Sequence, residues 1–265
     1  IGLRAAEYFH RISNFAMKIS LVTITLNNAH GLEQTLASAC AQSRRPDQHI
    51  VVDGFSTDGT ADVLKRYDSD IELINREPTG VYDAINAGFS NADGDVVGML
   101  HAGDTFTDDE VLKRVGEAFE ADPDLDFLFG DVHFAPEGGP TLRYYSGKAG
   151  SLESVINGFA PPHPSLYVRG RLIASKGLYK ADYRLSADFE MFCRLFSDSS
   201  LKWRYLPLDM VCMSPGGLSS KLSSRLWVHN VERLRALRQN GLPASLFNIS
   251  KHYLQVLKSF IYKNG

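Results

Sequence analysis

The sequence predicts an α/β fold with a mainly parallel central sheet flanked by helices. From residue 18 to residue 130, short apolar runs alternate with amphipathic helical patterns, as in strands joined by right-handed crossovers. Residues 94–104, GDVVGMLHAGD, place a β-branched apolar run between two turns rich in Gly and Asp. This run predicts a buried strand with Asp104 at its carboxyl end, where ligands bind in α/β sheets.

Five strands and four helices account for the first half of the chain. Each strand is an apolar run that ends in polar or turn-forming residues, and each helix carries apolar residues on one face. We expect strands at residues 18–26, 49–53, 71–75, 96–100 and 126–130, and helices at 31–43, 60–67, 81–91 and 108–120.

After residue 142 the alternation weakens, which predicts an α+β extension of the same domain. We expect strands near residues 143–146, 165–168, 203–206 and 210–213, and helices near 152–157 and 187–196. Two amphipathic helices, at 221–239 and 246–262, would form a C-terminal helical extension. We therefore divide the chain into a leader or cloning remnant at 1–16, one domain at 17–220, and a basic amphipathic extension at 221–265.

The composition is that of an ordinary globular protein. Hydrophobic residues make up 44% and charged residues 22% of the 265 residues, which argues against disorder and fibrous folds. The three cysteines lack CxxC spacing, so neither a disulfide framework nor a zinc site is indicated. A reducing compartment fits best, and because no run of 18 apolar residues and no secretory signal occurs, we expect a cytoplasmic protein.

The formal net charge of −3 hides an asymmetry along the chain. Residues 221–265 contain eight Lys and Arg against one acidic residue, giving +7, so residues 1–220 carry −10. The chain therefore lacks a generally basic surface of the nucleic-acid-binding type, and we expect no nucleic-acid partner.

A second carboxylate, Asp53, ends the strand at 49–53 and should lie at the same sheet edge as Asp104. It could accept a hydrogen bond from a uracil imide or a ribose hydroxyl, and turn formation is an equal alternative. No GxGxxG follows the first strand and no GxxxxGK[ST] occurs, which excludes the usual phosphate cradles. A diphosphate here would need a metal ion, and Asp104 is the candidate ligand.

Acidic residues also open the helix at 187–196. Asp188 and Glu190 stand in its first turn, where the helix dipole favours acids, and one of them is a candidate general base. Two residues apart on a helix they diverge by about 200°, so they cannot flank one bond as a glycosidase pair would. His163 is held between two prolines and could contact an acceptor or a metal ion; a structural role is at least as open.

Six motifs in this order resemble a family 2 glycosyltransferase with the GT-A (nucleotide-diphospho-sugar transferase) fold, particularly the bacterial branch that makes O-antigen, capsule and other exopolysaccharides. They are VTITLNN, VVDGFSTDGT, REPTGVYDAINAG, GDVVGMLHAGD, PPHPSLYV and SADFEMFCRL. Each motif is loose, but the set in this order is specific, and it covers roughly residues 18–220.

The resemblance implies roles for individual residues. The nucleoside of the donor would be held by Thr25, Asn27 and Asp53. The donor pocket over the ribose and the sugar would be shaped by Glu77, Tyr82, Asp83 and Asn86. Asp104 would bind Mn²⁺ or Mg²⁺, Asp188 would be the catalytic base, and His163 and Glu190 would contact the acceptor or support the residues that do.

The resemblance also implies an inverting transfer from a nucleotide diphosphate sugar, with UDP as the commonest nucleotide in that family. The acceptor would be a glycan or a lipid-linked acceptor. The motif HAGD keeps one carboxylate where many relatives have two or three, Thr79 replaces a usually charged residue, and Gly54-Phe55 replaces a commoner Asp-Gly or Gly-Gly pair. These departures leave the transferred sugar open.

Two other classes remain open from the sequence. One is a nucleotidyltransferase on a related sheet, which would be expected to carry a Gly- and Lys/Arg-rich loop after the first strand. The other is a non-catalytic nucleotide-sugar binding protein, which the reduced metal motif favours and the retained Asp188 disfavours. The basic helix at 246–262 could contact the inner face of an anionic membrane, or pack on its own domain or in a homo-oligomer.

Overall fold

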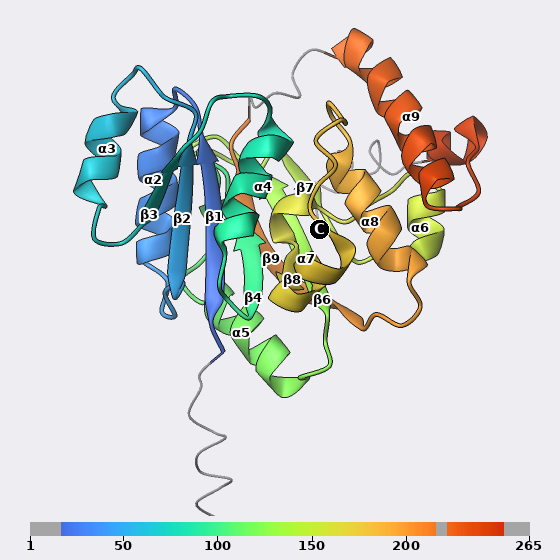
Figure 1. Ribbon diagram of the computed structural model, residues 1–265, viewed down its shortest axis with the longest axis horizontal. Coiled ribbons are helices and arrows are strands. Elements are labelled where there is room, and N and C mark those ends of the chain that lie inside the picture. The colour runs from blue at the N-terminus through green and yellow to red at the C-terminus, as the bar shows by residue number, and fades with distance from the viewer. Residues whose placement is uncertain (1–16, 216–221, 252–265) are drawn as a thin grey trace, which may run out of the picture.

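The computed structural model describes residues 17–215 and 222–251, and it confirms the predicted α/β architecture (Figure 1). Its described strands form one sheet in the order β3-β2-β1-β4-β8-β6-β9-β5, with β7 paired to β6. Helices cover both faces of this sheet (Figure 1). The predicted leader at 1–16 lies outside the described residues, as does most of the predicted helix at 246–262.

The first four strands of this order are wholly parallel, as expected from the alternation. They are β1 (Ile19–Thr25), β2 (Gln48–Asp53), β3 (Glu72–Asn75) and β4 (Val96–Met99). Thr25 pairs with Asp53, and Asp53 pairs with Asn75. The carboxyl ends of β1, β2 and β3 are therefore level, and the residues that follow them share one edge of the sheet.

Three helices cover the parallel strands. They are α2 (Ala29–Cys40), α3 (Thr60–Arg66) and α4 (Val81–Asn91). The side chain of Val51 packs against α2 and α3, whereas Ile50 and Val52 pack against α4. Successive strand residues point to opposite faces, so β2 is buried on both sides, which explains its unbroken apolar run.

The other half of the sheet is mixed. Its strands are β5 (Thr105–Phe106), β6 (Phe127–Phe134), β7 (Arg143–Tyr145), β8 (Tyr167–Arg169) and β9 (Trp203–Met213), and its helices are α5 (Val111–Ala121), α6 (Leu152–Ile156), α7 (Gly170–Lys176), α8 (Ala187–Ser197) and the 3₁₀ helix η1 (His163–Ser165). Strand β8 lies antiparallel to β4 and β6.

Three elements of this half differ from the prediction. The strands expected at 203–206 and 210–213 are one strand, because the pairing of β6 with β9 continues past an irregularity between Phe129 and Val132. An extra residue in a strand bends it without ending the ladder. Strand β5 and helix α7 were not predicted, since each is too short for its apolar pattern to show a period.

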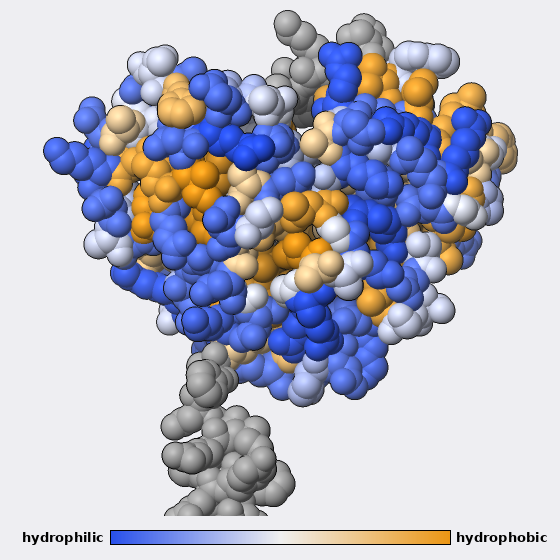
Figure 2. All heavy atoms as spheres, viewed as in Figure 1, coloured by the Kyte–Doolittle hydropathy of each residue, from blue (hydrophilic) through white to orange (hydrophobic). Residues whose placement is uncertain are grey.

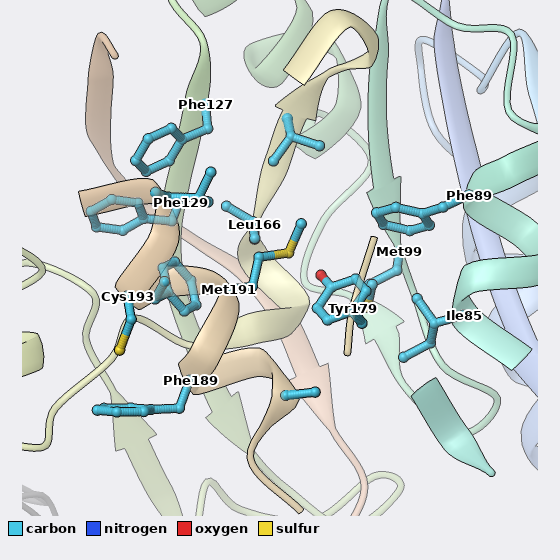
Figure 3. Close-up of a cluster of buried hydrophobic side chains, with 14 of the residues drawn as sticks. Ile85, Phe89, Met99, Phe127, Phe129, Leu166, Tyr179, Phe189, Met191 and Cys193 are labelled. Atoms are coloured by element: carbon cyan, nitrogen blue, oxygen red, sulfur yellow. The ribbon is translucent and has the colours of Figure 1, made fainter. Parts of the chain in front are cut away.

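The main core lies between the sheet and helix α8. Phe127 and Phe129 of β6 point from the sheet into this core (Figure 3). Both meet Phe196 of α8 edge to face, at ring distances of 5.6 and 5.9 Å, and Phe129 meets Phe192 in the same way. Such edge-to-face pairs add to the stabilisation from burial alone. They fix the position of α8, whose first turn carries Asp188.

Helix α9 (Leu222–Gln239) packs on α8, so this part of the extension is joined to the rest of the fold (Figure 1). The carboxylate of Glu232 accepts hydrogen bonds from the backbone N–H groups of Arg184 (2.7 Å) and Leu185 (2.9 Å). Ala236 and Leu237 are fully buried. None of the helices in the described ranges combines the length and apolar character needed to span a membrane.

Candidate active site

The loops after β1 and β2 are tied together by side chains. The carboxylate of Asp53 accepts hydrogen bonds from the backbone N–H (3.0 Å) and the hydroxyl (2.5 Å) of Ser56. The side-chain oxygen of Asn27 accepts one from the backbone N–H of Thr57 at 2.8 Å. Both proposed nucleoside-binding residues thus shape the loop, and a nucleotide would have to share or displace these hydrogen bonds.

The hydroxyl of Thr25 lies at the same edge. Its oxygen is buried and makes no hydrogen bond within the described part of the chain, although buried hydroxyls are usually paired. A cavity of about 640 Å³ lies between β3 and α3, and its lining includes Asp53 and Asn75. Apolar side chains of this region, including Leu73, are exposed at the surface over β3 (Figure 2). The carboxyl edge of the sheet thus offers a hydroxyl that is unpaired among the described residues, together with a partly apolar cavity. This combination suits an aromatic base that carries polar groups.

Asp104 lies in the turn between β4 and β5. The side chain is only 7% exposed, and its Oδ1 accepts a hydrogen bond from the backbone N–H of Ser214 at 3.3 Å. Burial raises the pKa of this carboxyl to about 7, and the Ser214 hydrogen bond opposes the rise. Gly103, directly before it, has φ = 105°, a conformation that glycine adopts without strain. The turn therefore buries a carboxylate with little compensation.

These features fit a divalent cation held at Asp104. A cation would offset the cost of burying this negative charge. The described residues contain no group of three or more His, Cys, Asp and Glu side chains placed to hold a metal ion. The other ligands would therefore have to come from the diphosphate and water, which is a usual way of holding Mg²⁺.

Asp188 lines a small cavity at the start of α8. The cavity has a volume of about 100 Å³, and its walls include His163, Tyr145, His229 and Arg233. The hydroxyl of Tyr82 donates a hydrogen bond to Oδ1 of Asp188 at 3.3 Å. A carboxylate at the mouth of a small cavity can take a proton from a hydroxyl group that enters it.

Tyr82, Asn86 and His163 meet around Tyr179, a residue that the sequence did not single out. The amide of Asn86 exchanges two hydrogen bonds with the backbone of Tyr179, at 2.7 and 2.9 Å. The ring of Tyr82 stacks on that of Tyr179 at 6.0 Å, and the Tyr179 hydroxyl lies 2.6 Å from Nε2 of His163. Burial raises the pKa of Tyr179 and lowers that of His163. This neutral cluster supports the side of the cavity next to Asp188.

Asp83 holds the loop before α4. It accepts two hydrogen bonds from the guanidinium of Arg76, at 2.6 and 2.8 Å, and one from the hydroxyl of Thr79. The Arg76 interaction is the main cause of the lowered pKa of Asp83. Glu77 lies in this loop with an exposed side chain. Asp83 thus organises the loop, and Glu77 is the residue of the pair that is free to meet a ligand.

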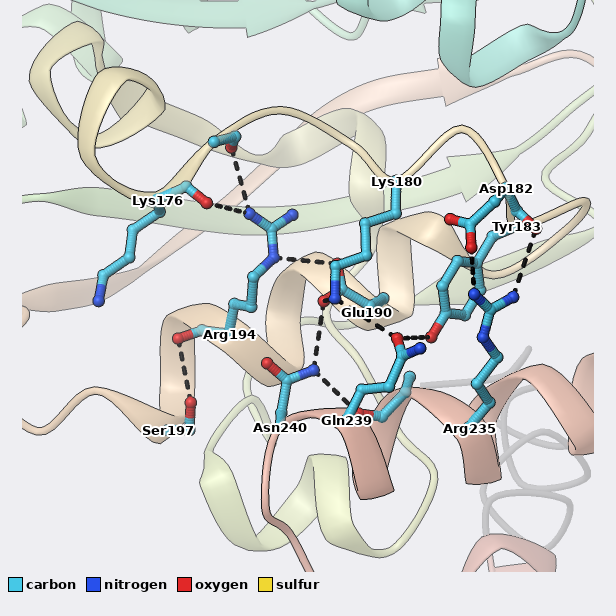
Figure 4. A network of polar contacts seen from close by, with 12 residues as sticks. Lys176, Lys180, Asp182, Tyr183, Glu190, Arg194, Ser197, Arg235, Gln239 and Asn240 are labelled. Carbon is cyan, nitrogen blue, oxygen red and sulfur yellow. Dashed lines mark hydrogen bonds and ion pairs between the residues drawn. The ribbon is translucent and has the colours of Figure 1, made fainter.

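Glu190 lies in a closed polar network away from the Asp188 cavity (Figure 4). Its fully buried carboxylate meets Arg194 at 2.9 Å and Lys180 at 2.7 Å, and the amide of Asn240 donates to it at 3.2 Å. The two acids of the first turn therefore point to different surroundings, as their divergence on the helix predicts. The geometry favours a supporting role for Glu190 over an acceptor contact.

We expect Glu190→Gln to destabilise the fold by about 3–5 kcal/mol, because it leaves the guanidinium of Arg194 largely buried without its carboxylate. The free energy of unfolding from urea titration is the measurement. Asp182→Asn is the matched control, since Asp182 pairs with Arg235 at an exposed site, where such pairs contribute about 0–1 kcal/mol. A loss below about 1 kcal/mol in Glu190→Gln would contradict a structural role for the network.

Several site residues could not be found from the sequence. Ser214, after β9, is 110 residues from Asp104. His101 has a buried Nδ1 that no residue in the described ranges contacts by a hydrogen bond. Its ring lies 6.2 Å from that of His163, so the end of β4 approaches the Asp188 cavity. Burial lowers the pKa of His101 to about 3. In the sequence, only the position of His101, three residues before Asp104, pointed to the site. That position did not distinguish a buried imidazole from a turn residue.

The sequence matches the model of a protein family described as glycosyl transferase family 2, over residues 20–200. It is also 31% identical over 183 residues to an uncharacterized glycosyltransferase of Mycobacterium tuberculosis. That alignment covers 68% of this chain and 69% of the relative. The region matched by the family model contains β1 apart from its first residue, every strand from β2 to β8, and helix α8.

Two solved structures have a similar fold. One is S. aureus TarS 1–349 in complex with UDP-GlcNAc, with a TM-score of 0.65 and 19% identity, covering 93% of this chain and 72% of that one. The other is the mannosyltransferase PcManGT from Pyrobaculum calidifontis in complex with GDP-Man and Mn²⁺. Its TM-score is 0.57 at 18% identity, covering 90% of this chain and 69% of that one. Because the sequence identities are only 19% and 18%, these similarities describe the fold.

Proposed function

Because the chain belongs to glycosyl transferase family 2 and has the GT-A fold, we propose that it is an inverting transferase for a nucleotide diphosphate sugar. The observation that carries the proposal is the placement of Asp188 in a small cavity at the first turn of α8. The approach of His101 to His163 links this cavity to the strand end that carries Asp104.

The proposed reaction is a single displacement. Asp188 takes the proton from an acceptor hydroxyl as its oxygen attacks the anomeric carbon, and the bond between that carbon and the diphosphate oxygen breaks. The hydroxyl of Tyr82 holds Asp188 in position. A Mn²⁺ or Mg²⁺ ion bound at Asp104 would supply positive charge to the departing diphosphate. The base of the nucleotide would lie at the edge formed by Thr25, Asn27 and Asp53.

We propose a UDP-sugar as the donor, with GDP-sugars as the alternative. The supporting comparisons are divided: TarS binds UDP-GlcNAc and PcManGT binds GDP-Man. The proposed acceptor is a glycan or lipid-linked acceptor of bacterial surface polysaccharide synthesis, reached from the cytoplasm. Exposed Trp227 and Phe247, 69% and 75% exposed, support peripheral contact of the extension with the inner face of the membrane.

The test is release of nucleotide diphosphate from UDP-Glc, UDP-GlcNAc, GDP-Man and dTDP-Glc, each with and without Mn²⁺. The nucleotide product is measured by chromatography. We expect Mn²⁺-dependent release from the donors of one nucleotide. Donors of that nucleotide should be consumed faster when a glycan acceptor is added. Release from none of the four, by folded protein that also fails to bind UDP or GDP, would contradict the proposal.

A further inference from the structure

The cavity that holds Asp188 has one wall made by helix α9. His229 and Arg233 are four residues apart, so they lie on the same side of the helix, and both line the cavity. Residues 20–200 match the family model, so this wall comes from outside the matched region. The role of His229 and Arg233 therefore does not follow from the family match, and it has to be argued from the cavity that they line.

Arg233 has no acidic partner among the residues that the structure describes. Its guanidinium lies over the ring of Phe189, with Cζ 5.3 Å from the ring centre. Its Nε is buried, and no described residue accepts a hydrogen bond from it. Within residues 17–215 and 222–251 no ion pair reaches it, whereas Arg235 pairs with Asp182 and Arg194 pairs with Glu190.

The acids nearest in the chain are not available to Arg233. Both carboxylate oxygens of Glu232 are used by the backbone of residues 184 and 185. Outside the described ranges the sequence contains a single acidic residue, Glu7. A buried guanidinium N–H without a partner is uncommon, because its hydration is lost without replacement. Such an arrangement at a cavity wall fits a group that is completed by a ligand.

The chemistry of that ligand follows from the guanidinium. Arginine presents a planar set of N–H donors that matches the oxygens of a phosphate or a carboxylate. An anionic group entering beside Asp188 would otherwise be repelled by that carboxylate. The cation of Arg233, which lines the same cavity, offsets this repulsion, and the basic extension raises the local concentration of anions.

We propose that Arg233 binds an oxyanion of the acceptor, so that the enzyme glycosylates an acceptor carrying a phosphate or a carboxylate close to the hydroxyl that reacts. Arg233 is then a specificity-determining residue, and the proposal rests on the transfer reaction proposed above. The phosphate and carboxylate forms share this chemistry, and the experiment separates them.

Binding is tested first, without donor or divalent metal, by calorimetry with methyl phosphate, glucuronate and neutral methyl glucoside. The wild type and Arg235→Gln should bind one of the two anions at least tenfold more tightly than Arg233→Gln does, and methyl glucoside should not distinguish the variants. Arg235→Gln removes the same charge from the same helix outside the cavity. Equal anion binding by Arg233→Gln and the wild type, or an equal loss in Arg235→Gln, would overturn the proposal.

Transfer is tested with three acceptors that share one sugar: the neutral glycoside, its phosphate monoester and its uronic acid. In the wild type, kcat/KM should favour one anionic acceptor at least tenfold over the neutral glycoside, chiefly through KM, and in Arg233→Gln the ratio of kcat/KM between the anionic and the neutral acceptor should fall to about one. Arg233→Lys, which keeps the charge and loses the planar fork, should recover part of this preference. A preference that survives Arg233→Gln would overturn the assignment.

Failure of the anion site and failure of the transfer reaction give different results. Anion binding that depends on Arg233 in a protein that never consumes a nucleotide sugar would refute the transfer reaction and leave the anion site standing. Consumption of a nucleotide sugar in which Arg233 has no effect would refute the anion site and leave the transfer reaction standing. Arg233→Gln should unfold at a temperature close to that of the wild type, which shows that its loss of anion binding does not come from misfolding.

Discussion

Asp188→Asn is expected to lower the rate of sugar transfer by about 10²–10⁴-fold and to leave nucleotide-sugar binding unchanged. Asn has the shape of Asp and can keep the hydrogen bond from Tyr82, but it cannot take the proton from the acceptor hydroxyl. A loss confined to kcat, with an unchanged dissociation constant for the donor, is the result expected when an interaction made only in the transition state is removed.

The measurement is the initial rate of transfer together with calorimetric binding of the donor. Asp182→Asn is the matched control, because it removes an acidic group from the loop before α8 without touching the cavity. It should keep the wild-type rate. Turnover of Asp188→Asn within about tenfold of the wild type would rule out Asp188 as the base and point to another residue of the cavity.

Asp104→Asn is expected to abolish metal-dependent nucleotide binding while stabilising the metal-free fold. In the folded protein the pKa of Asp104 is raised from 3.8 to about 7. Between these values the folded state holds more protons than the unfolded state, so the free energy of unfolding falls as pH rises from about 4 to 7. Three pKa units correspond to about 4 kcal/mol, and a neutral Asn does not carry this cost.

The two consequences are measured separately. Urea unfolding with EDTA should show Asp104→Asn to be more stable than the wild type at pH 8, by at most about 4 kcal/mol, with the difference vanishing near pH 4. Thermal shifts with UDP or GDP should rise with Mn²⁺ in the wild type only. A variant that is less stable at pH 8, or that keeps the Mn²⁺-dependent shift, would contradict a cation site at Asp104.

The parts of the site that follow regular elements could be predicted from the sequence. Asp53 and Asp104 end apolar runs, so their place at the carboxyl edge followed from the direction of the strands, and the register of β1 with β2 agrees with it. The opposed positions of Asp188 and Glu190 followed from helical geometry. What these side chains contact could not be predicted, because partners such as Ser56 and Arg194 depend on the course of loops and on packing.

Two residues near Asp188 show why the rest of the site could not be predicted from the sequence. Tyr179 lies in an irregular segment between two helices, and Arg233 comes from a helix 45 positions after Asp188 in the chain. Neither has a local pattern that marks a residue of the site. Tertiary packing alone brings Arg233 to the wall of the cavity and Tyr179 against His163 and Tyr82. The same holds for Ser214 at Asp104.

The account's central claim is single displacement with inversion, and the configuration of the sugar at the moment of release tests it most directly. Many transferases pass a sugar to water slowly, so proton NMR of fresh enzyme with an α-linked UDP- or GDP-sugar and Mn²⁺ needs no knowledge of the acceptor. The account predicts that the β-anomer appears first, in wild type and not in Asp188→Asn. Initial release of the α-anomer by an Asp188-dependent reaction would contradict it.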